Sequence, residues 1–331
     1  MQFGVAFIPG FPAEQTIALA AEAERLGYDY LFLPDQTFHR DPFTLLGLCA
    51  HATQTIRLGL GVTNPYSRHP VQIARSAGTV ADISDGRFVL GLGAGNGPTV
   101  LGGLGLKHVQ VIARVREATD VIRRLLRGET VDHHSPTLTV NSVRLDFEVA
   151  SPVPIFLASR NPGMLALAGE VADGVMFESL QTKPSLDYAL EQVSAGAGRA
   201  GRSLRDLVTS SWQMLFLDDD PDIARRADVL RWATSIVTST RPEVLRTLDI
   251  DAARPPGSRY EAGPAEAVKL FTIGSSEAVI RQLSTISAAG VELYTGVVHG
   301  DAAAIRATMR RFAAEVMPAV ASRRPADPGA S

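Results

Sequence analysis

The chain has 331 residues, of which 45% are hydrophobic and 20% are charged, and its 32 Lys and Arg nearly balance 35 Asp and Glu. This composition is typical of a compact protein with a large core. Because basic residues are not in excess, we do not expect nucleic acid as a partner. The sequence has no apolar run long enough to span a membrane and no basic segment typical of a signal peptide. We therefore expect a cytoplasmic protein that makes no membrane contact.

The first half of the chain alternates short apolar runs with amphipathic stretches. The apolar run 3–9 is followed by an Ala- and Glu-rich stretch, 13–26, that stops at Gly27. This pattern predicts a strand and then a helix with a glycine stop. The same order recurs along the chain and predicts parallel strands joined by right-handed crossovers. The next three strands, each followed by its helix, are expected at 30–34 with 43–52, at 56–62 with 71–83, and at 88–93 with 109–126.

The pattern lapses at about 128–150, where alternation around 137–147 predicts an inserted hairpin or extended loop. Strand and helix units then resume at 154–158 with 164–172, 174–177 with 186–200, 207–216 with helices within 222–248, and 292–298 with 302–317. Eight units predict a (β/α)8 TIM barrel in one domain, 1–320. A doubly wound α/β sheet follows the same pattern and stays an alternative, because its strands are also buried on both faces.

Two further segments stand outside the barrel pattern. A second insertion is expected at 249–268, where the stretch 249–264 is rich in Pro, Gly and Ala. We predict that this stretch is a mobile loop over the barrel mouth. The last residues, 321–331, are predicted to be disordered.

Polar residues follow several predicted strands, at the end of a barrel where ligands bind. Gly93, Gly95 and Gly97 after the fourth strand permit close approach of the backbone to a planar ring, although an ordinary tight loop has the same pattern. A predicted helix begins near Gly163, where free N–H groups would accept a phosphate beside Arg160; a routine helix start is the alternative. The polar runs lie at 35–40, 63–70, 93–97 and 159–163 and at Glu178.

The segment GLGVTNPYSRHPVQIARSAGTVADISDGRFVLGLGAGN, residues 59–96, resembles the core signature of the luciferase-like flavin-dependent oxidoreductases. It is most similar to the deazaflavin-dependent branch that includes the methylenetetrahydromethanopterin reductases. Weaker similarity at 33–36, 156–177 and 271–294 extends the resemblance over nearly the whole chain, and it implies a single-domain TIM barrel that is bacterial-luciferase-like. The resemblance implies coenzyme F420 as the cofactor, with FMN as the alternative.

The resemblance also implies which residues hold the cofactor. It places a cis, non-proline peptide at Gly61-Val62. Asp35 and Asn64 would hydrogen-bond the ring or its side chain, and Ala94 and Gly95 would offer backbone groups. The phosphate would be held by the loop and helix start after the fifth strand, at Arg160, Asn161, Gly163 and Met164.

Two positions depart from the acid–base pattern of similar sugar-phosphate dehydrogenases. Those enzymes have a His and a Glu where this chain has Gln36 and Asn96. Amides do not shuttle protons at neutral pH, which argues against alcohol oxidation and favours hydride delivery to a C=N or C=C bond of a small organic molecule. His39 and Glu178 remain candidate proton donors, and a surface role is the alternative for both.

Other functions and partners stay open at this point. A reduced-FMN-dependent monooxygenase is one alternative, and a flavin-binding barrel without catalysis is another. The resemblance implies a homodimer through helices near the second and third units, and the apolar run 45–52 is compatible with such a surface or with the core. No metal site is expected, because Cys49 is the single cysteine and the adjacent His133 and His134 point apart on a strand.

Overall fold

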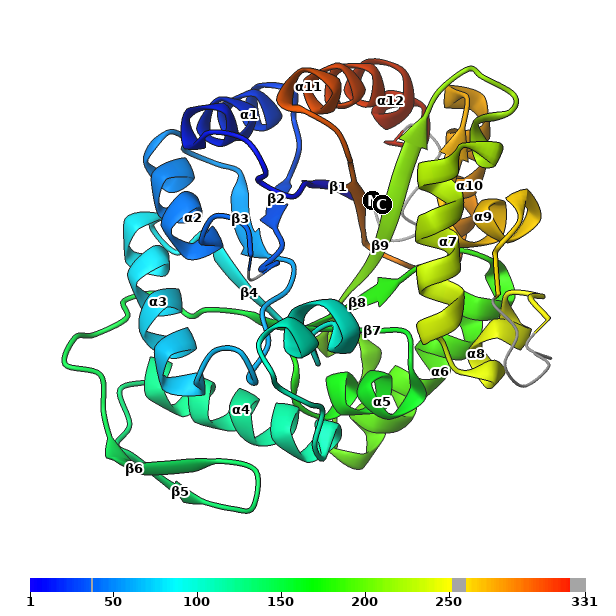
Figure 1. Ribbon diagram of the computed structural model, residues 1–331. Helices are drawn as coiled ribbons and strands as arrows, with labels where there is room; N and C mark the ends of the chain where they lie inside the picture. The colour runs from blue at the N-terminus through cyan, green and yellow to red at the C-terminus, as the bar shows by residue number, and fades with distance from the viewer. Residues whose placement is uncertain (37, 252–259, 322–331) are drawn as a thin grey trace, which may run out of the picture.

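The computed structural model describes residues 1–36, 38–251 and 260–321, and a closed ring of parallel strands lies at its centre (Figure 1). The ring closes because β9 pairs with both β11 and β8. An open doubly wound sheet would leave two free edges, so the predicted (β/α)8 barrel is confirmed. In ring order the strands are β9 (Val208–Leu217), β11 (Leu293–Val297), β1 (Gln2–Ala6), β2 (Tyr30–Leu33), β3 (Arg57–Leu60), β4 (Phe88–Leu92), β7 (Ile155–Ser159) and β8 (Gly174–Glu178).

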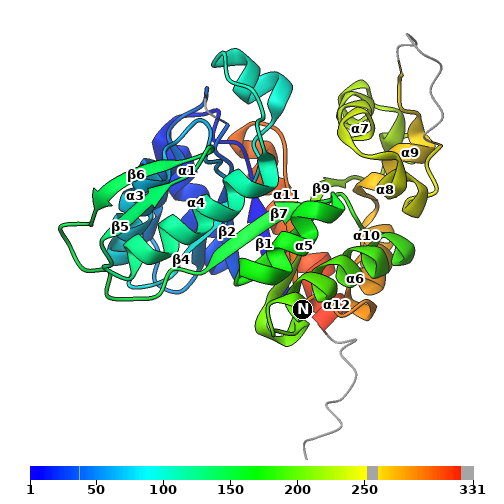
Figure 2. The same cartoon turned by 90° about the horizontal axis from the view of Figure 1, so that it is seen from below.

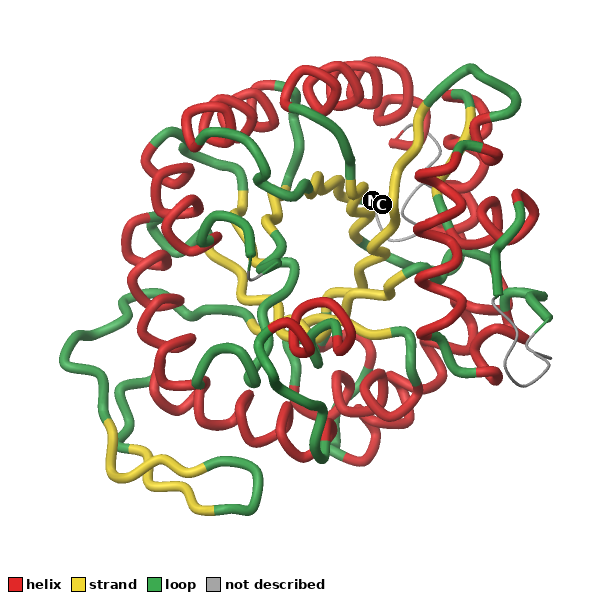
Figure 3. The backbone as a smooth tube through the Cα atoms, viewed as in Figure 1, coloured by secondary structure: helices red, strands yellow, loops and turns green. Residues whose placement is uncertain are grey.

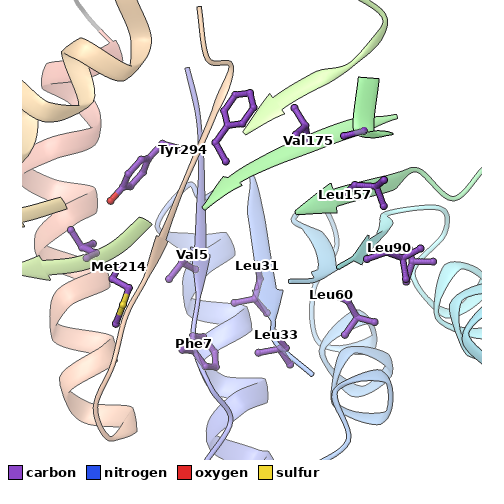
Figure 4. Packing of buried hydrophobic residues seen from close by; sticks show 14 of the residues in the cluster. Val5, Phe7, Leu31, Leu33, Leu60, Leu90, Leu157, Val175, Met214 and Tyr294 are labelled. Atoms are coloured by element: carbon purple, nitrogen blue, oxygen red, sulfur yellow. The ribbon is translucent and has the colours of Figure 1, made fainter. Parts of the chain in front are cut away.

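Alternate side chains of these strands face two different layers, because successive residues of a strand point to opposite sides. Val5, Leu31 and Leu60 belong to the larger apolar cluster between strands and helices, which Figure 4 shows from close by. Tyr30 and Phe156 belong to a smaller cluster that fills the barrel interior. The continuous apolar runs of the sequence are therefore the signature of strands buried on both faces.

Two glycines, Gly59 within β3 and Gly61 just after its carboxyl end, leave room for aromatic side chains of neighbouring strands. A Cβ atom on Gly59 would lie 2.3 Å from the ring of Phe32, and one on Gly61 would lie 2.1 Å from the ring of Trp212. Aromatic side chains of β2 and β9 thus fill the space that β3 leaves empty. Phe32 and Trp212 also meet each other edge to face, with ring centroids 5.5 Å apart.

An outer ring of helices covers the strands (Figure 3). Polar side chains start several of these helices: Asp41, Ser275 and Asp301 each accept a hydrogen bond from a backbone N–H of the first turn. The helices are α1 (Ala13–Arg25), α2 (Pro42–His51), α3 (Pro70–Ile83), α4 (Val111–Leu126), α5 (Pro162–Val171), α6 (Lys183–Arg199), α7 (Ala227–Ser239), α8 (Pro242–Thr247), α9 (Pro264–Leu270), α10 (Ser276–Ala288), α11 (Ala302–Arg311) and α12 (Met317–Ala321).

The seventh unit differs from the sequence prediction. The helices expected within 222–248 appear as α7 and α8, but with α9 they stand beyond the strand ends (Figure 2). The position in the outer ring that was expected for these helices is occupied by α10, which the strand and helix pattern of the sequence does not predict. A short strand, β10 (Thr272–Gly274), leads into α10 and pairs with the last residues of the long β9.

The two predicted insertions have different outcomes. The alternating stretch forms an antiparallel hairpin, β5 (Val131–His134) with β6 (Thr139–Val143). The predicted loop at 249–264 falls largely on 252–259, which lie outside the described residues, as do 322–331 of the predicted tail. Among the helices that are described, none combines the length and apolar character needed to cross a membrane.

Candidate active site

The loops that carry the predicted site residues meet at one end of the barrel. They follow β2, β3, β4, β7 and β8, and parallel strands present their carboxyl ends at the same side. The segment η1 (Gly97–Leu101) and helices α7 to α9 stand at this end (Figure 2). The barrel mouth is therefore bordered by η1 near β4 and by α7 near β9 (Figure 1).

Asp35, directly after β2, is the centre of a buried polar cluster. Its side chain is only 2% exposed and accepts hydrogen bonds from the Thr63 hydroxyl (2.7 Å) and from Arg68 Nε (2.6 Å). Arg68 also pairs with Asp41, whose pKa is raised by burial but lowered more strongly by hydrogen bonds from Thr44 and Arg68. The net effect is a lowered pKa of Asp41, and the hydrogen bonds of Arg68 to Asp35 and Asp41 tie the β2 and β3 loops together.

Asn64 and Gly95 lie in contact across the β3 and β4 loops. The Asn64 side chain folds back, and its Oδ1 accepts from the backbone N–H groups of Tyr66 and Ser67. Gly95 has φ +78°, and a Cβ atom there would lie 2.9 Å from Asn64 Cγ. Only glycine allows this approach, so the glycine-rich loop packs directly against Asn64.

The carbonyl groups of Ala94 and Gly95 are engaged by a histidine that the sequence did not single out. His108 Nε2 lies 2.9 Å from Ala94 O and 3.1 Å from Gly95 O, so it acts as the donor to this loop. Its ring meets Tyr66 edge to face. The loop therefore has a fixed backbone whose carbonyls already have a partner.

The peptide bond Gly61-Val62 is cis, as expected from the resemblance. It lies at the end of β3, and the backbone then continues toward β4, with Thr63 N donating to Gly91 O and Gly93 N donating to Thr63 O. Trp212 packs against Gly61 from inside the barrel and is partly exposed. This indole forms part of the floor of the mouth.

The start of α5 offers backbone donors beside a buried polar atom. Asn161 is the N-cap residue, and its side chain does not cap the helix. Its Oδ1 atom is buried and has no hydrogen-bond partner among the described residues. Gly163 and Met164 occupy the first turn after Pro162, where N–H groups point out of a helix. This combination fits a polar, anionic group such as a phosphate.

Arg160 joins three elements at the same edge of the mouth. Its Nη1 lies 2.8 Å from Glu178 Oε1 at the end of β8, and its Nη2 donates to Ser239 Oγ at the end of α7 (2.9 Å). The Arg160 side chain is only 10% exposed, and its Nε is buried without a partner among the described residues. Glu178 is thus the ion-pair partner of Arg160, and its side chain is 40% exposed at the mouth.

The remaining predicted residues differ in exposure. Gln36 is partly buried, whereas Asn96 and His39 are exposed. The Asn96 carbonyl accepts from the N–H groups of Val100 and Leu101 and so starts η1. The three residues lie in the loops after β2 and β4, on the rim of the mouth.

Sequence reasoning assigned no role to several residues of this site. Arg68 stands in the polar run after β3, but only the fold shows that it reaches Asp35 and Asp41. Trp212 belongs to no motif of the sequence, and only the fold shows that it packs against Gly61. Of the part of the chain that the structure describes, no group of His, Cys, Asp and Glu side chains has the arrangement of a metal site.

Comparisons with known proteins match most of the chain. The family model described as luciferase-like monooxygenase matches residues 1–293. A 5,10-methylenetetrahydromethanopterin reductase of Archaeoglobus fulgidus is 33% identical over 317 residues, which cover 91% of this chain and 93% of the relative. An F420-dependent glucose-6-phosphate dehydrogenase of Nakamurella multipartita is 32% identical over 67% of this chain and 69% of its own length.

A solved structure supports the fold independently. The coenzyme F420-dependent tetrahydromethanopterin reductase from Methanopyrus kandleri superposes with a TM-score of 0.80. The match covers 96% of this chain and 98% of the other, at 23% sequence identity. At this sequence identity, the superposition shows that the two proteins share a fold.

Proposed function

The chain belongs to the luciferase-like monooxygenase family, and on that premise we propose that it is an F420-dependent reductase. It transfers a hydride between the deazaflavin and a small organic substrate, at a C=N or C=C bond. The observation that carries this proposal is the mouth of the barrel, where the closely packed Gly93–Gly97 loop and the start of α5, which no side chain caps, lie at the same end. Relatives whose names include F420 support the choice of cofactor.

The residues at the mouth divide into two parts that suit the two ends of such a cofactor. The peptide Gly61-Val62, Ala94 and Gly95 would lie against the ring, together with Asn64 and the Asp35 cluster. When bound, F420 supplies or accepts the hydride. The phosphate would be held by the N–H groups of Gly163 and Met164, with Asn161 beside them and Arg160 adding positive charge.

The side chains near the expected reaction centre support reduction of an activated double bond. Gln36 and Asn96 carry amides that donate and accept hydrogen bonds but do not release a proton. Oxidation of an alcohol needs a base that takes the hydroxyl proton, and neither amide can do so. We therefore assign both residues to substrate orientation.

The test is a direct titration of the purified protein with F420 and with FMN, followed by fluorescence quenching. We expect F420 to bind more tightly than FMN. Equal affinity for both, or tighter binding of FMN, would overturn the proposal in favour of an FMN-dependent monooxygenase. Binding of F420 without turnover of any activated imine or enone would favour a non-catalytic flavin-binding barrel.

We also propose that two copies of the chain form a homodimer through α2 and α3. A groove of about 730 Å³ lies between these helices and Phe147. Leu48 on α2 and Ile83 on α3 line it and are 45% and 47% exposed. Exposed apolar side chains along a shared groove support a protein interface at this surface.

A further inference from the structure

His299 lies at the barrel mouth in a position that the proposed function does not use. It follows β11 by two residues, and Leu293 and Val297 of that strand belong to the interior cluster. Because side chains alternate along extended backbone, His299 continues the series that faces the interior. It therefore stands at the carboxyl end of β11, where the loops of the candidate site meet.

The surroundings of His299 are apolar on one side and leave one nitrogen without a partner. The ring packs on Trp232 of α7, with centroids 5.0 Å apart. Nε2 is buried, and no group of the described residues hydrogen-bonds to it. Burial lowers the pKa of His299, and Asp228 only partly opposes this effect. The neutral ring has one N–H donor and one acceptor nitrogen.

Three other histidines in the loops at the mouth either have hydrogen-bond partners or are exposed. His108 is hydrogen-bonded to the carbonyl groups of the glycine-rich loop. His69 caps α3, since its Nδ1 accepts from the Val71 N–H, and His39 is exposed. A buried polar atom that lacks a partner costs free energy unless a ligand or solvent satisfies it. His299 thus differs from these three by a buried nitrogen that is available to a ligand.

We propose that His299 is a substrate-binding residue whose Nε2 hydrogen-bonds the heteroatom that activates the double bond, the nitrogen of an imine or the carbonyl oxygen of an enone. Trp232, which is 37% exposed, covers the flat face of the same substrate. This inference rests on the proposed function and narrows its substrate class to planar, conjugated imines and enones. A broad indole beside one directional polar atom suits a flat molecule with a single heteroatom better than a flexible polyol.

Two substitutions separate hydrogen bonding from packing. His299→Phe keeps a ring against Trp232 and removes the polar atom, whereas His299→Gln keeps a polar atom and removes the ring. With 3,4-dihydroisoquinoline as the probe and reduced F420 as the hydride source, we expect kcat/KM to fall about 10-fold or more in the Phe variant, mainly through KM. The Gln variant should stay within about 3-fold of the wild type. A packing role alone would reverse this order and overturn the proposal.

A second readout does not require turnover. In protein labelled with ¹⁵N-histidine, the Nε2 resonance of His299 is identified by its loss in His299→Gln, and the imine is then titrated in. We expect this resonance to move while that of the exposed hairpin residue His134 does not. A His299 resonance that stays in place up to the solubility limit of the imine would overturn the proposal. Failure of the wild type to bind F420 would instead contradict the proposed function and leave this measurement intact.

Discussion

Gly61 and Trp212 illustrate how one missing side chain shapes the floor of the candidate site. A Cβ atom at residue 61 would lie 2.1 Å from a ring carbon of Trp212. Gly61→Ala should therefore displace the indole or the end of β3 and reduce the free energy of unfolding by about 1–3 kcal/mol. The same shift should weaken F420 binding, because it moves the surface that the ring would contact. Urea denaturation and F420 titration of the purified variant measure both effects.

A matched substitution shows whether the clash is the cause. Gly198 lies exposed on α6, and a Cβ atom there meets nothing within 4 Å. Gly198→Ala should leave F420 affinity unchanged and leave stability equal or higher by up to about 1 kcal/mol, because alanine favours a helix. Equal losses in the two variants would contradict the packing explanation for Gly61.

Gln36 and Asn96 replace the acid and base of similar dehydrogenases, so their removal should act on positioning. We expect Gln36→Ala and Asn96→Ala to reduce turnover about 10- to 100-fold, which corresponds to one hydrogen bond of roughly 1.5–3 kcal/mol. The pH profile of kcat/KM should keep the shape of the wild type, because amides do not titrate. Steady-state kinetics across pH provide the check. A loss beyond about 10⁴-fold in either variant would show an essential chemical role and contradict this prediction.

At the scale of elements, Glu22 joins the first helix of the ring to α11. Its carboxylate is buried on α1, and it accepts from Arg306 Nε (2.7 Å) and Arg310 Nε (2.5 Å). Burial raises the pKa of Glu22, but the hydrogen bonds and charges of the two arginines outweigh it and lower the pKa. The two ion pairs of Glu22 therefore stabilise the fold fully at a pH above the pKa of an unfolded Glu. This stabilisation is lost as the pH falls through the lower, folded-state pKa.

Glu22→Gln should reduce the free energy of unfolding by about 1–3 kcal/mol at neutral pH, because a buried acceptor charge is lost while two cations remain. The difference from wild type should shrink as the pH falls below about 4.5, the ordinary value for a Glu. Urea denaturation at neutral and at acidic pH measures this trend. Glu277→Gln on α10, whose ion pair with Arg281 is exposed, serves as the control and should change stability by less than about 0.5 kcal/mol. A Glu22 effect independent of pH would contradict the ion-pair explanation.

The elements that the sequence predicted best are those with strong local signals. The eight barrel strands are apolar runs that end at polar loops, and the chain pairs them in order. α10 was missed because its pattern competes with that of α7 and α8, and periodicity does not say which helix packs on β9. β10 is only three residues long and is defined by its pairing with β9, a contact between distant segments.

The same limit applies to the site. Polar loops after strands could be found from the sequence, and so could a glycine-rich loop and a helix start. The partners of Asp35 and Arg160 depend on side chains that reach across loops, such as Arg68 and Ser239. His299 is a clear example, because nothing in its immediate sequence indicates that it packs on Trp232.

At the scale of the whole molecule, the mouth and the α2–α3 groove lie on different elements. The mouth is bordered by η1 and α7, whereas residues of α2 and α3 line the groove. These two helices belong to the outer ring (Figure 1). Asp41 is a link between them, because it lines the groove and also pairs with Arg68 beside Asp35. A partner seated in the groove would therefore approach one end of the buried cluster at the base of the site.

The homodimer can be tested by placing charge in the groove. We expect the wild type to have twice the chain mass by light scattering at micromolar concentration. The double variant Leu48→Arg and Ile83→Arg should be a monomer, because two cations would be buried against the same surface of the second copy. Val268→Arg on α9 is the control: Val268 is similarly exposed (47%), lies outside the groove and should leave the mass unchanged. A monomeric wild type, or a double variant that still dimerises, would contradict an interface at α2 and α3.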